Sequence, residues 1–537
     1  MKRGSNVVPL VLPDRNATFQ RLLNDVLERN RHPQGRYEIA ATIESMGWND
    51  QRVYEMFGTE DVFALAEEMW SVIEQKILFA TFAKPTKPHA LVLLWEMVRQ
   101  FLRGLIYALP MAISVLSMLT LKFSLWSYEH LSVELATCIA IGTILSFLTV
   151  GGFTQAIARR GYFYLQLGYY NMGRKMTFSF IRMGYLTSIV VFLAVYLFNL
   201  VFLIFSHEMM LVVLLYFFFL NSIWLSVTVM YILRKELTFT GLIVLGIALV
   251  YLLFRVFGLD ILFAQLISMT LVALVGLVLV LYFFKQEERK EEKGIAPRMP
   301  RLGVTIYSVL PYFLYGFLYF LLLYVDRVMA WSTNGEFMPY LIWFRGEYEL
   351  GLDFALLVLM IPLGVSEVLV HQLMVSLEAS QKSFWGFETA KMGQKFVREY
   401  QRMLWIISGT SLFSGVVVYV GITFADGKYE AATGHPLLGS EVTVAVFICS
   451  ILAYAVLAVA LMNAVVLFSL SQPRLVNRAI WPAVIADVIV GFVLTRWIEY
   501  GYAAAGLLVG TLVFVYLSTR EVRRVLKNVD YYLYAIS

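Results

Sequence analysis

Six ionisable side chains of this 537-residue chain lie inside long apolar segments, where little water is available to solvate a charge. They are Asp487, Glu367, His371, Asp326, Arg327 and Arg182, of which Asp487 is the deepest. An ionisable residue at the centre of a membrane-spanning helix costs on the order of 3 kcal/mol, so it usually faces an interior cavity that carries an ion or a substrate. We therefore predict that these residues line a transport cavity.

Most of these residues also have a purely structural interpretation. Glu367 and His371 are four residues apart, hence on one helix face, and would then pair with each other. Arg182 would extend its guanidinium to the lipid headgroups, and Asp326 with Arg327 would form an ordinary interfacial pair. The imidazole of His371 titrates near neutral pH and could tune a proton-coupled step.

Three tyrosines, Tyr312, Tyr315 and Tyr319, follow one another at spacings of three and four residues. This spacing places them on one stripe of a helix. Aromatic faces stack on sugar rings, so a cavity lined in this way would suit a glycan. The alternative is that the stripe packs against a neighbouring helix.

Motifs for enzymatic chemistry are missing from the sequence. The pair Gly427-Lys428 lacks the upstream glycine of a nucleotide-binding loop, and His207-Glu208 is not followed by a second histidine at zinc-binding spacing. The cysteines, Cys138 and Cys449, both fall in apolar runs and make neither a metal cluster nor a disulfide framework. We expect no cofactor, no bound metal and no enzymatic activity.

The composition is that of a membrane protein. Hydrophobic residues make up 59% of the chain and charged residues 15%, whereas a typical soluble chain carries roughly 25% charged residues. A membrane-spanning helix needs about 20 apolar residues. Twelve stretches qualify, approximately 104–126, 131–157, 178–205, 209–233, 239–257, 260–284, 304–331, 351–377, 403–424, 441–470, 479–497 and 503–519.

The distribution of charge predicts the orientation of these spans. If the N-terminus is cytosolic, the inner connections carry 23 Lys and Arg residues and the outer connections carry 3. Cytosolic loops are rich in Lys and Arg, so both termini are predicted to be cytosolic. The charged linker 285–303 separates six spans in residues 89–284 from six in 304–519, with a tail at 520–537. We therefore predict an all-α polytopic membrane protein of two six-helix bundles.

Residues 1–88 precede the first span and form a polar module. Helical patterns run over Thr18–Asn30, Arg36–Met46, Asp50–Phe57 and Glu60–Phe79, with Asn49 as a plausible cap. Residues 1–78 contain 9 Lys and Arg against 12 Asp and Glu. That balance has the wrong sign for a phosphate-binding surface, so we predict a small cytosolic helical module that does not bind nucleic acid.

The segment from span seven into span eight carries a recognisable pattern. It contains Asp326-Arg327 and Ala330-Trp331, then Trp343-Phe344-Arg345, Tyr348-Glu349, Phe354-Ala355 and Pro362. In these residues, and in its layout over about residues 100–520, the chain resembles the Pel exopolysaccharide transporter family, a branch of the multidrug/oligosaccharidyl-lipid/polysaccharide flippase superfamily. The module at 1–88 is not part of that resemblance.

The resemblance implies a multi-pass protein of the bacterial inner membrane that exports a growing polysaccharide. It also implies work beside a cytosolic glycosyltransferase and other membrane proteins of a synthase complex. Three functions stay open: a polysaccharide or lipid-linked-glycan exporter, a cation-coupled exporter of small amphipathic compounds, and a membrane scaffold of a glycan synthase that does not transport.

Overall fold

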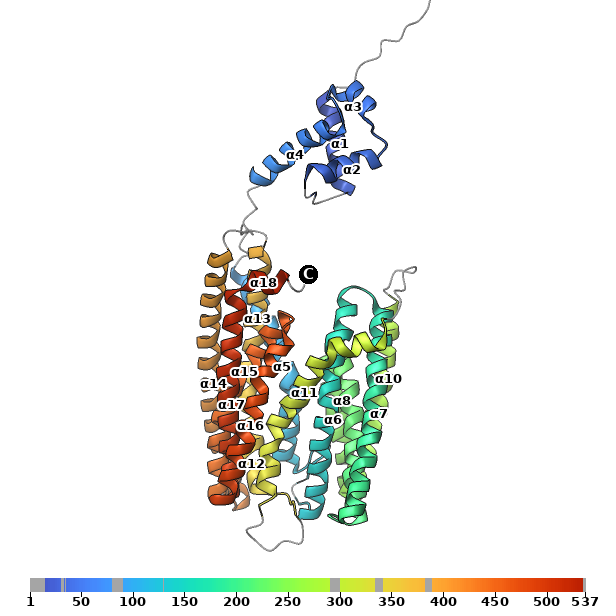
Figure 1. Ribbon diagram of the computed structural model, residues 1–537. Coiled ribbons are helices and arrows are strands. Elements are labelled where there is room, and N and C mark those ends of the chain that lie inside the picture. The colour runs from blue at the N-terminus through green and yellow to red at the C-terminus, as the bar shows by residue number, and fades with distance from the viewer. Residues whose placement is uncertain are drawn as a thin grey trace, which may run out of the picture. The chain divides into compact units, whose positions relative to one another are not determined.

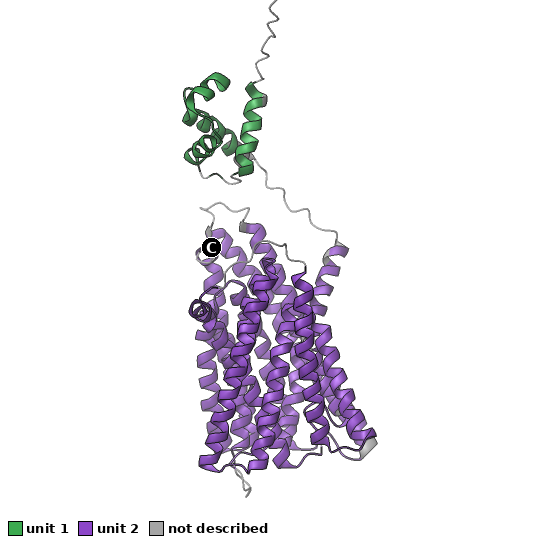
Figure 2. Cartoon of the chain, turned by 90° about the vertical axis from the view of Figure 1, so that its right-hand side faces the viewer, with its two compact units in different colours: residues 1–89 green, residues 90–537 purple. Residues whose placement is uncertain are grey.

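The computed structural model describes residues 15–29, 33, 35–79, 90–128, 130–289, 300–333, 341–381 and 389–534. The chain forms two compact units, Met1–His89 and Ala90–Ser537 (Figure 2). Within the described residues every regular element is a helix. The expected all-helical fold with a small N-terminal helical module is confirmed.

The first unit is built from four short helices around a small apolar core. They are α1 (Arg15–Arg29), α2 (Arg36–Ser45), α3 (Asp50–Phe57) and α4 (Val62–Phe79). The Asn49 side chain accepts a hydrogen bond from the backbone N–H of Arg52 and caps α3, as expected. Gly58 ends the same helix at φ 69°, a left-handed conformation that suits glycine. Val53 and Phe57 of α3 are buried in the core.

Replacing Asn49 by alanine should loosen α3 in the full-length protein, because a lost N-cap costs about 1 kcal/mol. Hydrogen–deuterium exchange of the α3 amides should rise accordingly. Asn24→Ala, at an exposed position within α1, is the matched control and should leave exchange unchanged. Equal exchange in both variants would show that the cap does not hold α3.

The second unit contains the membrane-spanning helices (Figure 1). Its helices are α5 (Ala90–Leu121), α6 (Val133–Gln166), α7 (Tyr170–Phe202), α8 (His207–Ile232), α9 (Glu236–Tyr251), α10 (Ile261–Glu288), α11 (Leu302–Trp331), α12 (Gly346–Leu356), α13 (Met360–Gln381), α14 (Thr389–Thr433), α15 (Glu441–Ser469), α16 (Pro473–Trp497), α17 (Ala503–Lys527) and α18 (Val529–Tyr534). A short 3-10 turn joins α12 to α13, and together they make one span.

Eleven helices in the described residues are long and apolar enough to cross a membrane, and α5 makes a twelfth if its two halves count as one span. Those halves, Leu94–Ile106 and Leu109–Met118, meet at an angle of 52°. Pro110 lies at the bend, and proline is a usual cause of a sharp kink. The helix begins at Ala90, well before the apolar stretch predicted at 104–126, and this first part carries Glu96, Arg99 and Arg103.

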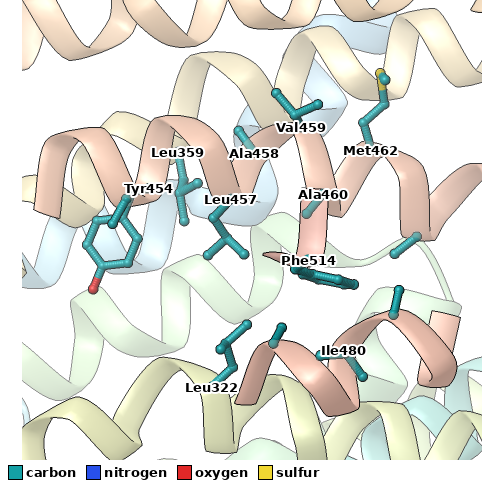
Figure 3. Close-up of a cluster of buried hydrophobic side chains, with 14 of the residues drawn as sticks. Leu322, Leu359, Tyr454, Leu457, Ala458, Val459, Ala460, Met462, Ile480 and Phe514 are labelled. Atoms are coloured by element: carbon teal, nitrogen blue, oxygen red, sulfur yellow. The ribbon is translucent and has the colours of Figure 1, made fainter. Parts of the chain in front are cut away.

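The helices pack as two bundles, each with its own apolar core. One core draws its buried side chains largely from α6 to α10, and the other from α11 to α17. Figure 3 shows part of the second core, where Leu322 of α11, Tyr454 and Leu457 of α15, Ile480 of α16 and Phe514 of α17 come together. Apolar side chains such as Leu193, Leu274 and Phe413 are exposed on the outside of the bundles, as expected of a lipid-facing surface.

Two helices, α11 and α5, connect the bundles. The long helix α11 runs obliquely between them (Figure 1): Val309 belongs to the first core, and Leu322 to the second. Glycines make the closest approaches. A Cβ built on Gly316 of α11 would lie 2.1 Å from the carbonyl oxygen of Gly151 in α6. Likewise, a Cβ on Gly104 of α5 would lie 2.7 Å from the Cα of Gly364 in α13.

Candidate functional site

A cavity of about 700 Å³ lies between the two bundles. Its walls come from α5, α6, α8, α9, α11, α13 and α15. It extends from Gly151 and Phe320, at the close contact of α6 with α11, toward Tyr162 and Arg234. The two ends of unit 2 differ in charge, and we call the end with Arg159, Arg174, Arg234, Lys285 and Arg474 the basic end. The cavity therefore reaches from the joint between the bundles toward the basic end.

Aromatic rings form the inner part of the cavity. Phe147 of α6 packs on Trp224 of α8 with ring centroids 4.8 Å apart, and on Phe320 of α11 at 4.9 Å. Both Phe320 and Tyr324 are stacked on the Phe147 ring, the latter at 5.3 Å. Rings from both bundles thus pack on one another at the α6–α11 end of the cavity.

Charged side chains of both signs line the rest of the cavity. Arg103, Arg234, Glu236 and Glu367 contribute two positive and two negative groups. Among the predicted site residues, Glu367 lies in this lining, and its Cβ would be 3.3 Å from a Cβ built on Gly104. Arg103 and Glu367 are not ion-paired within the described part of the chain. Both are therefore available to a polar solute.

A second group of polar residues is buried inside the second bundle. Arg327 donates from Nε to Glu349 at 2.7 Å and from its guanidinium to Asp353 at 3.3 Å. The Trp331 indole N–H donates to the other oxygen of Glu349 at 3.0 Å. Arg327 has 6% of its side chain exposed, Glu349 11% and Asp353 57%. The Arg327–Glu349 pair is thus the desolvated part of this cluster.

The neighbouring Asp326 does not pair with Arg327 through its carboxylate. Its Oδ2 accepts a hydrogen bond from the Tyr348 hydroxyl at 2.8 Å, and its Oδ1 has no partner. Asp487 of α16 is fully buried, and neither of its carboxylate oxygens has a hydrogen-bond partner in the described structure. Asp326 and Asp487 therefore lie within the second bundle and do not line the 700 Å³ cavity.

The tyrosine stripe packs between helices. Tyr312 and Tyr315 contact Phe468 of α15 at centroid distances of 5.4 Å and 4.8 Å, and Tyr319 stacks on Tyr315 at 6.0 Å. The guanidinium of Arg159 sits 5.2 Å from the Tyr312 ring. The structure thus places this stripe at the α11–α15 contact, and Phe320, the next residue after Tyr319, faces the cavity.

The remaining two predicted site residues, His371 and Arg182, lie neither in the cavity lining nor among the buried polar residues of the second bundle. His371 is exposed, and no ion pair joins it to Glu367, although both lie in the described part of α13. Arg182 is exposed on α7, as expected of a guanidinium that extends to lipid headgroups. The ionisable residues that we predicted to share one cavity are therefore distributed over three separate environments.

Sequence reasoning assigned no role to several residues of these sites. Arg103, Phe147 and Trp224 lie in the first bundle, and hydropathy alone does not distinguish a cavity-facing ring from a packed one. For Glu349 and Asp353 the sequence does contain an indication. Acidic residues four apart lie on the same helix face, so their carboxyl groups can share one partner. Among the described residues no group of three or more His, Cys, Asp or Glu side chains is placed to hold a metal ion.

Neither a family model nor a curated protein matches the sequence. Solved structures do match the fold. The eukaryotic MATE transporter AtDTX14 superposes with a TM-score of 0.54 at 12% identity, over 81% of this chain and 99% of that one. A variant of the Vibrio cholerae MATE transporter VcmN gives 0.55 at 14% identity, over 82% and 98%. A MOP superfamily transporter from Pyrococcus furiosus gives 0.52 at 14%, over 80% and 96%. The transmembrane unit has the fold of the MATE transporters, a polytopic membrane fold.

Proposed function

We propose that this chain is an exporter that moves a polysaccharide or a lipid-linked glycan across the bacterial inner membrane, with the cavity between the bundles as its path. The observation that carries the proposal is the cavity itself, with aromatic rings at its α6–α11 end and charges of both signs along its walls. Transporters built from two homologous bundles hold their substrate at the interface between them. The fold supports transport, and the resemblance to the Pel family supports a glycan.

The charge of the chain supports the proposed direction of transport. The basic end carries most of the Lys and Arg residues of the connections, so the positive-inside rule assigns it to the cytosol. The cavity extends to that same end, where Tyr162, Arg234 and Glu236 line it. A substrate would then enter from the cytosol, and the α6–α11 contact at Gly151 and Gly316 would close the path to the outside.

The chemistry of the cavity suits sugar rings better than a strongly charged solute. The rings of Phe147, Trp224 and Phe320 make part of the lining apolar and aromatic, and sugars present their C–H faces to such rings. Arg103 and Glu367 supply a hydrogen-bond donor and an acceptor in a cavity whose lining charges balance. A neutral or zwitterionic glycan would satisfy both without leaving a net charge buried.

Substitution of Glu367 by glutamine should reduce export by about ten-fold, the equivalent of roughly 1.4 kcal/mol of lost substrate contact. The measurement is the secreted glycan, with the glycan retained in the cell, in a deletion strain that carries the variant. Glu208→Gln is the matched control, because Glu208 is an exposed carboxylate in the first turn of α8. Unchanged export by the Glu367 variant would remove this carboxylate from the path.

The structure also offers support for export of small amphipathic compounds. A cavity of 700 Å³ falls within the range of about 300–1,000 Å³ that is typical of sites for small ligands. Resistance of the deletion strain to lipophilic cations distinguishes the two functions: a small-molecule exporter raises resistance and leaves the secreted glycan unchanged. A scaffold that does not transport would tolerate Glu367→Gln in both assays.

The partners that we propose are a cytosolic glycosyltransferase and membrane proteins of the synthase complex. Unit 1 has its own core of buried residues from α1 to α4, and we propose it as the docking module for these partners. Purification of the tagged full-length chain, and of a variant that begins at Ala90, tests this. If both forms retain the glycosyltransferase, the docking site lies on the transmembrane unit.

A further inference from the structure

Arginines of α6 and α16 are held on neighbouring residues of α11 at the basic end of unit 2. Arg160 of α6 donates a hydrogen bond to the Ser308 hydroxyl of α11 at 2.5 Å. Arg474, in the first turn of α16, donates to the Tyr307 hydroxyl at 3.2 Å. Tyr307 and Ser308 are adjacent in the sequence, so α11 brings a guanidinium from the first bundle close to one from the second.

Two more arginines extend this cluster. Arg159 of α6 donates to the Ser471 hydroxyl at 2.8 Å and lies 5.2 Å from the Tyr312 ring of α11. Ser471 precedes α16 and is three residues from Arg474. Arg478 lies one turn beyond Arg474, on the same face of α16, and its side chain is exposed. We call Arg159, Arg160, Arg474 and Arg478 the arginine seam.

The positive charge of the arginine seam is not balanced by protein carboxylates in the described part of the chain. The three hydrogen-bonded arginines donate to neutral hydroxyls, which leave the charge of a guanidinium in place. Elsewhere at the basic end the charges are paired, since Arg174 of α7 forms an ion pair with Glu288 of α10 at 2.5 Å. The seam therefore has the charge of an anion site.

The N-terminus of α16 adds to this positive potential. The helix is 25 residues long and begins at Pro473, and the side chain of its N-cap residue, Gln472, makes no capping hydrogen bond. The aligned peptide dipoles of a helix leave partial positive charge at its N-terminus, where phosphate groups commonly bind. Arg474 lies in this same first turn, so the helix end and the guanidinium favour an anion at one place.

The apolar surface beside the seam indicates which anion fits. Along α16, spacings of three and four residues lead from Arg478 to Trp481 and Ile485, whose side chains are 45% and 51% exposed. Leu310 of α11, three residues after Tyr307, is 52% exposed. These side chains face lipid, and the described lining of the 700 Å³ cavity does not include the seam arginines. A ligand here would have an anionic head and a hydrocarbon tail.

We infer that the arginine seam binds the phosphate group of an anionic membrane lipid, with the acyl chains along Leu310, Trp481 and Ile485. Guanidinium groups bind phosphate oxygens through paired, charge-assisted hydrogen bonds. A phosphate held by Arg160 and Arg474 joins α6 of the first bundle to α16 of the second. The lipid therefore stabilises the arrangement in which these two helices lie close together at the basic end.

Thermal unfolding of the purified full-length protein in an uncharged detergent tests the inference. Dioctanoyl phosphatidylglycerol should raise the unfolding midpoint until the site is saturated. Phosphatidylcholine with the same chains, and inorganic phosphate, should have no such effect at equal concentrations. The double variant Arg160→Gln, Arg474→Gln should need at least about ten-fold more phosphatidylglycerol, the equivalent of roughly 1.4 kcal/mol. Arg182→Gln, which changes an exposed arginine of α7, is the matched control and should respond like the wild type.

The midpoint without lipid verifies that each variant is folded, and Arg478→Gln provides a second test at an exposed position. It should also weaken the response to phosphatidylglycerol. The inference is overturned if phosphatidylglycerol does not shift the wild type, or if the double variant and Arg478→Gln respond like Arg182→Gln. An equal shift with phosphatidylcholine excludes recognition of an anionic lipid, and an equal shift with inorganic phosphate identifies a site for a free anion. No glycan enters the measurement, so failure of the export proposal would leave the result intact.

Discussion

Replacement of Arg327 by methionine is expected to destabilise the second bundle by about 3 to 5 kcal/mol, the usual cost of removing one partner of a buried ion pair. Methionine fills a similar length of space, so the loss is mainly electrostatic. Glu349, with 11% of its side chain exposed, would keep the Trp331 indole N–H as a partner and lose its cation. The midpoint of thermal unfolding in detergent, and the yield of monodisperse protein, measure the effect.

Two further variants make this result specific. Arg182→Met removes an exposed arginine of α7 and should change the unfolding midpoint little, because exposed charges contribute about 0 to 1 kcal/mol. Combining Arg327→Met with Glu349→Gln should restore much of the stability, because the unpaired charge is then gone. An unfolding midpoint for Arg327→Met as high as that of Arg182→Met would mean that the buried pair does not stabilise the fold.

Substitution of Gly316 by valine is expected to reduce export by about ten-fold or more, a change of at least roughly 1.4 kcal/mol in the step it blocks. Even a Cβ at this position would lie 2.1 Å from the Gly151 carbonyl oxygen. The clash is with backbone, so α11 must move away from α6. Phe320, one turn along α11, would then leave its 4.9 Å stack on Phe147 at the closed end of the cavity.

Gly303→Val is the matched control for this prediction. Gly303 lies in the first turn of the same helix, and nothing is within 4 Å of a Cβ built there. Export of the secreted glycan, normalised to the amount of folded protein in the membrane, should be normal for this variant. If Gly316→Val exports as well as Gly303→Val, the α6–α11 contact does not seal the path.

The two bundles also contact each other at the end of unit 2 that lies opposite the basic end. Lys122, which follows α5, donates to the hydroxyl of Tyr429 in α14 and lies 4.0 Å from its ring centroid. The backbone N–H of Phe344 donates to Thr137 of α6 at 2.9 Å. Both contacts join a residue from the first bundle to one from the second. They fit a state in which the cavity is closed at this end and reaches the basic end.

Local properties of the sequence determined the class of fold and the number of spans. Apolar length is a property of contiguous residues, so each of the twelve predicted stretches overlaps a long helix, eleven of them apolar enough to span and α5 a twelfth if its halves count as one. The largest errors of hydropathy were the starts of α5 and α14, because each helix begins with a turn or more that carries charged residues, such as Arg99 and Arg103 in α5. The N-cap of α3 could likewise be predicted, because Asn49 acts on the helix that follows it directly.

Which polar residues meet was decided by the tertiary structure. The sequence marked Asp326, Glu367 and Asp487 as unusual, because a charge in an apolar segment is costly wherever it lies. It could not separate the cavity residue Glu367 from the buried residues Asp326 and Asp487, since burial depends on how helices distant in sequence pack. Hydropathy is encoded residue by residue, whereas a cavity exists only between helices, and its lining is therefore a property of their packing.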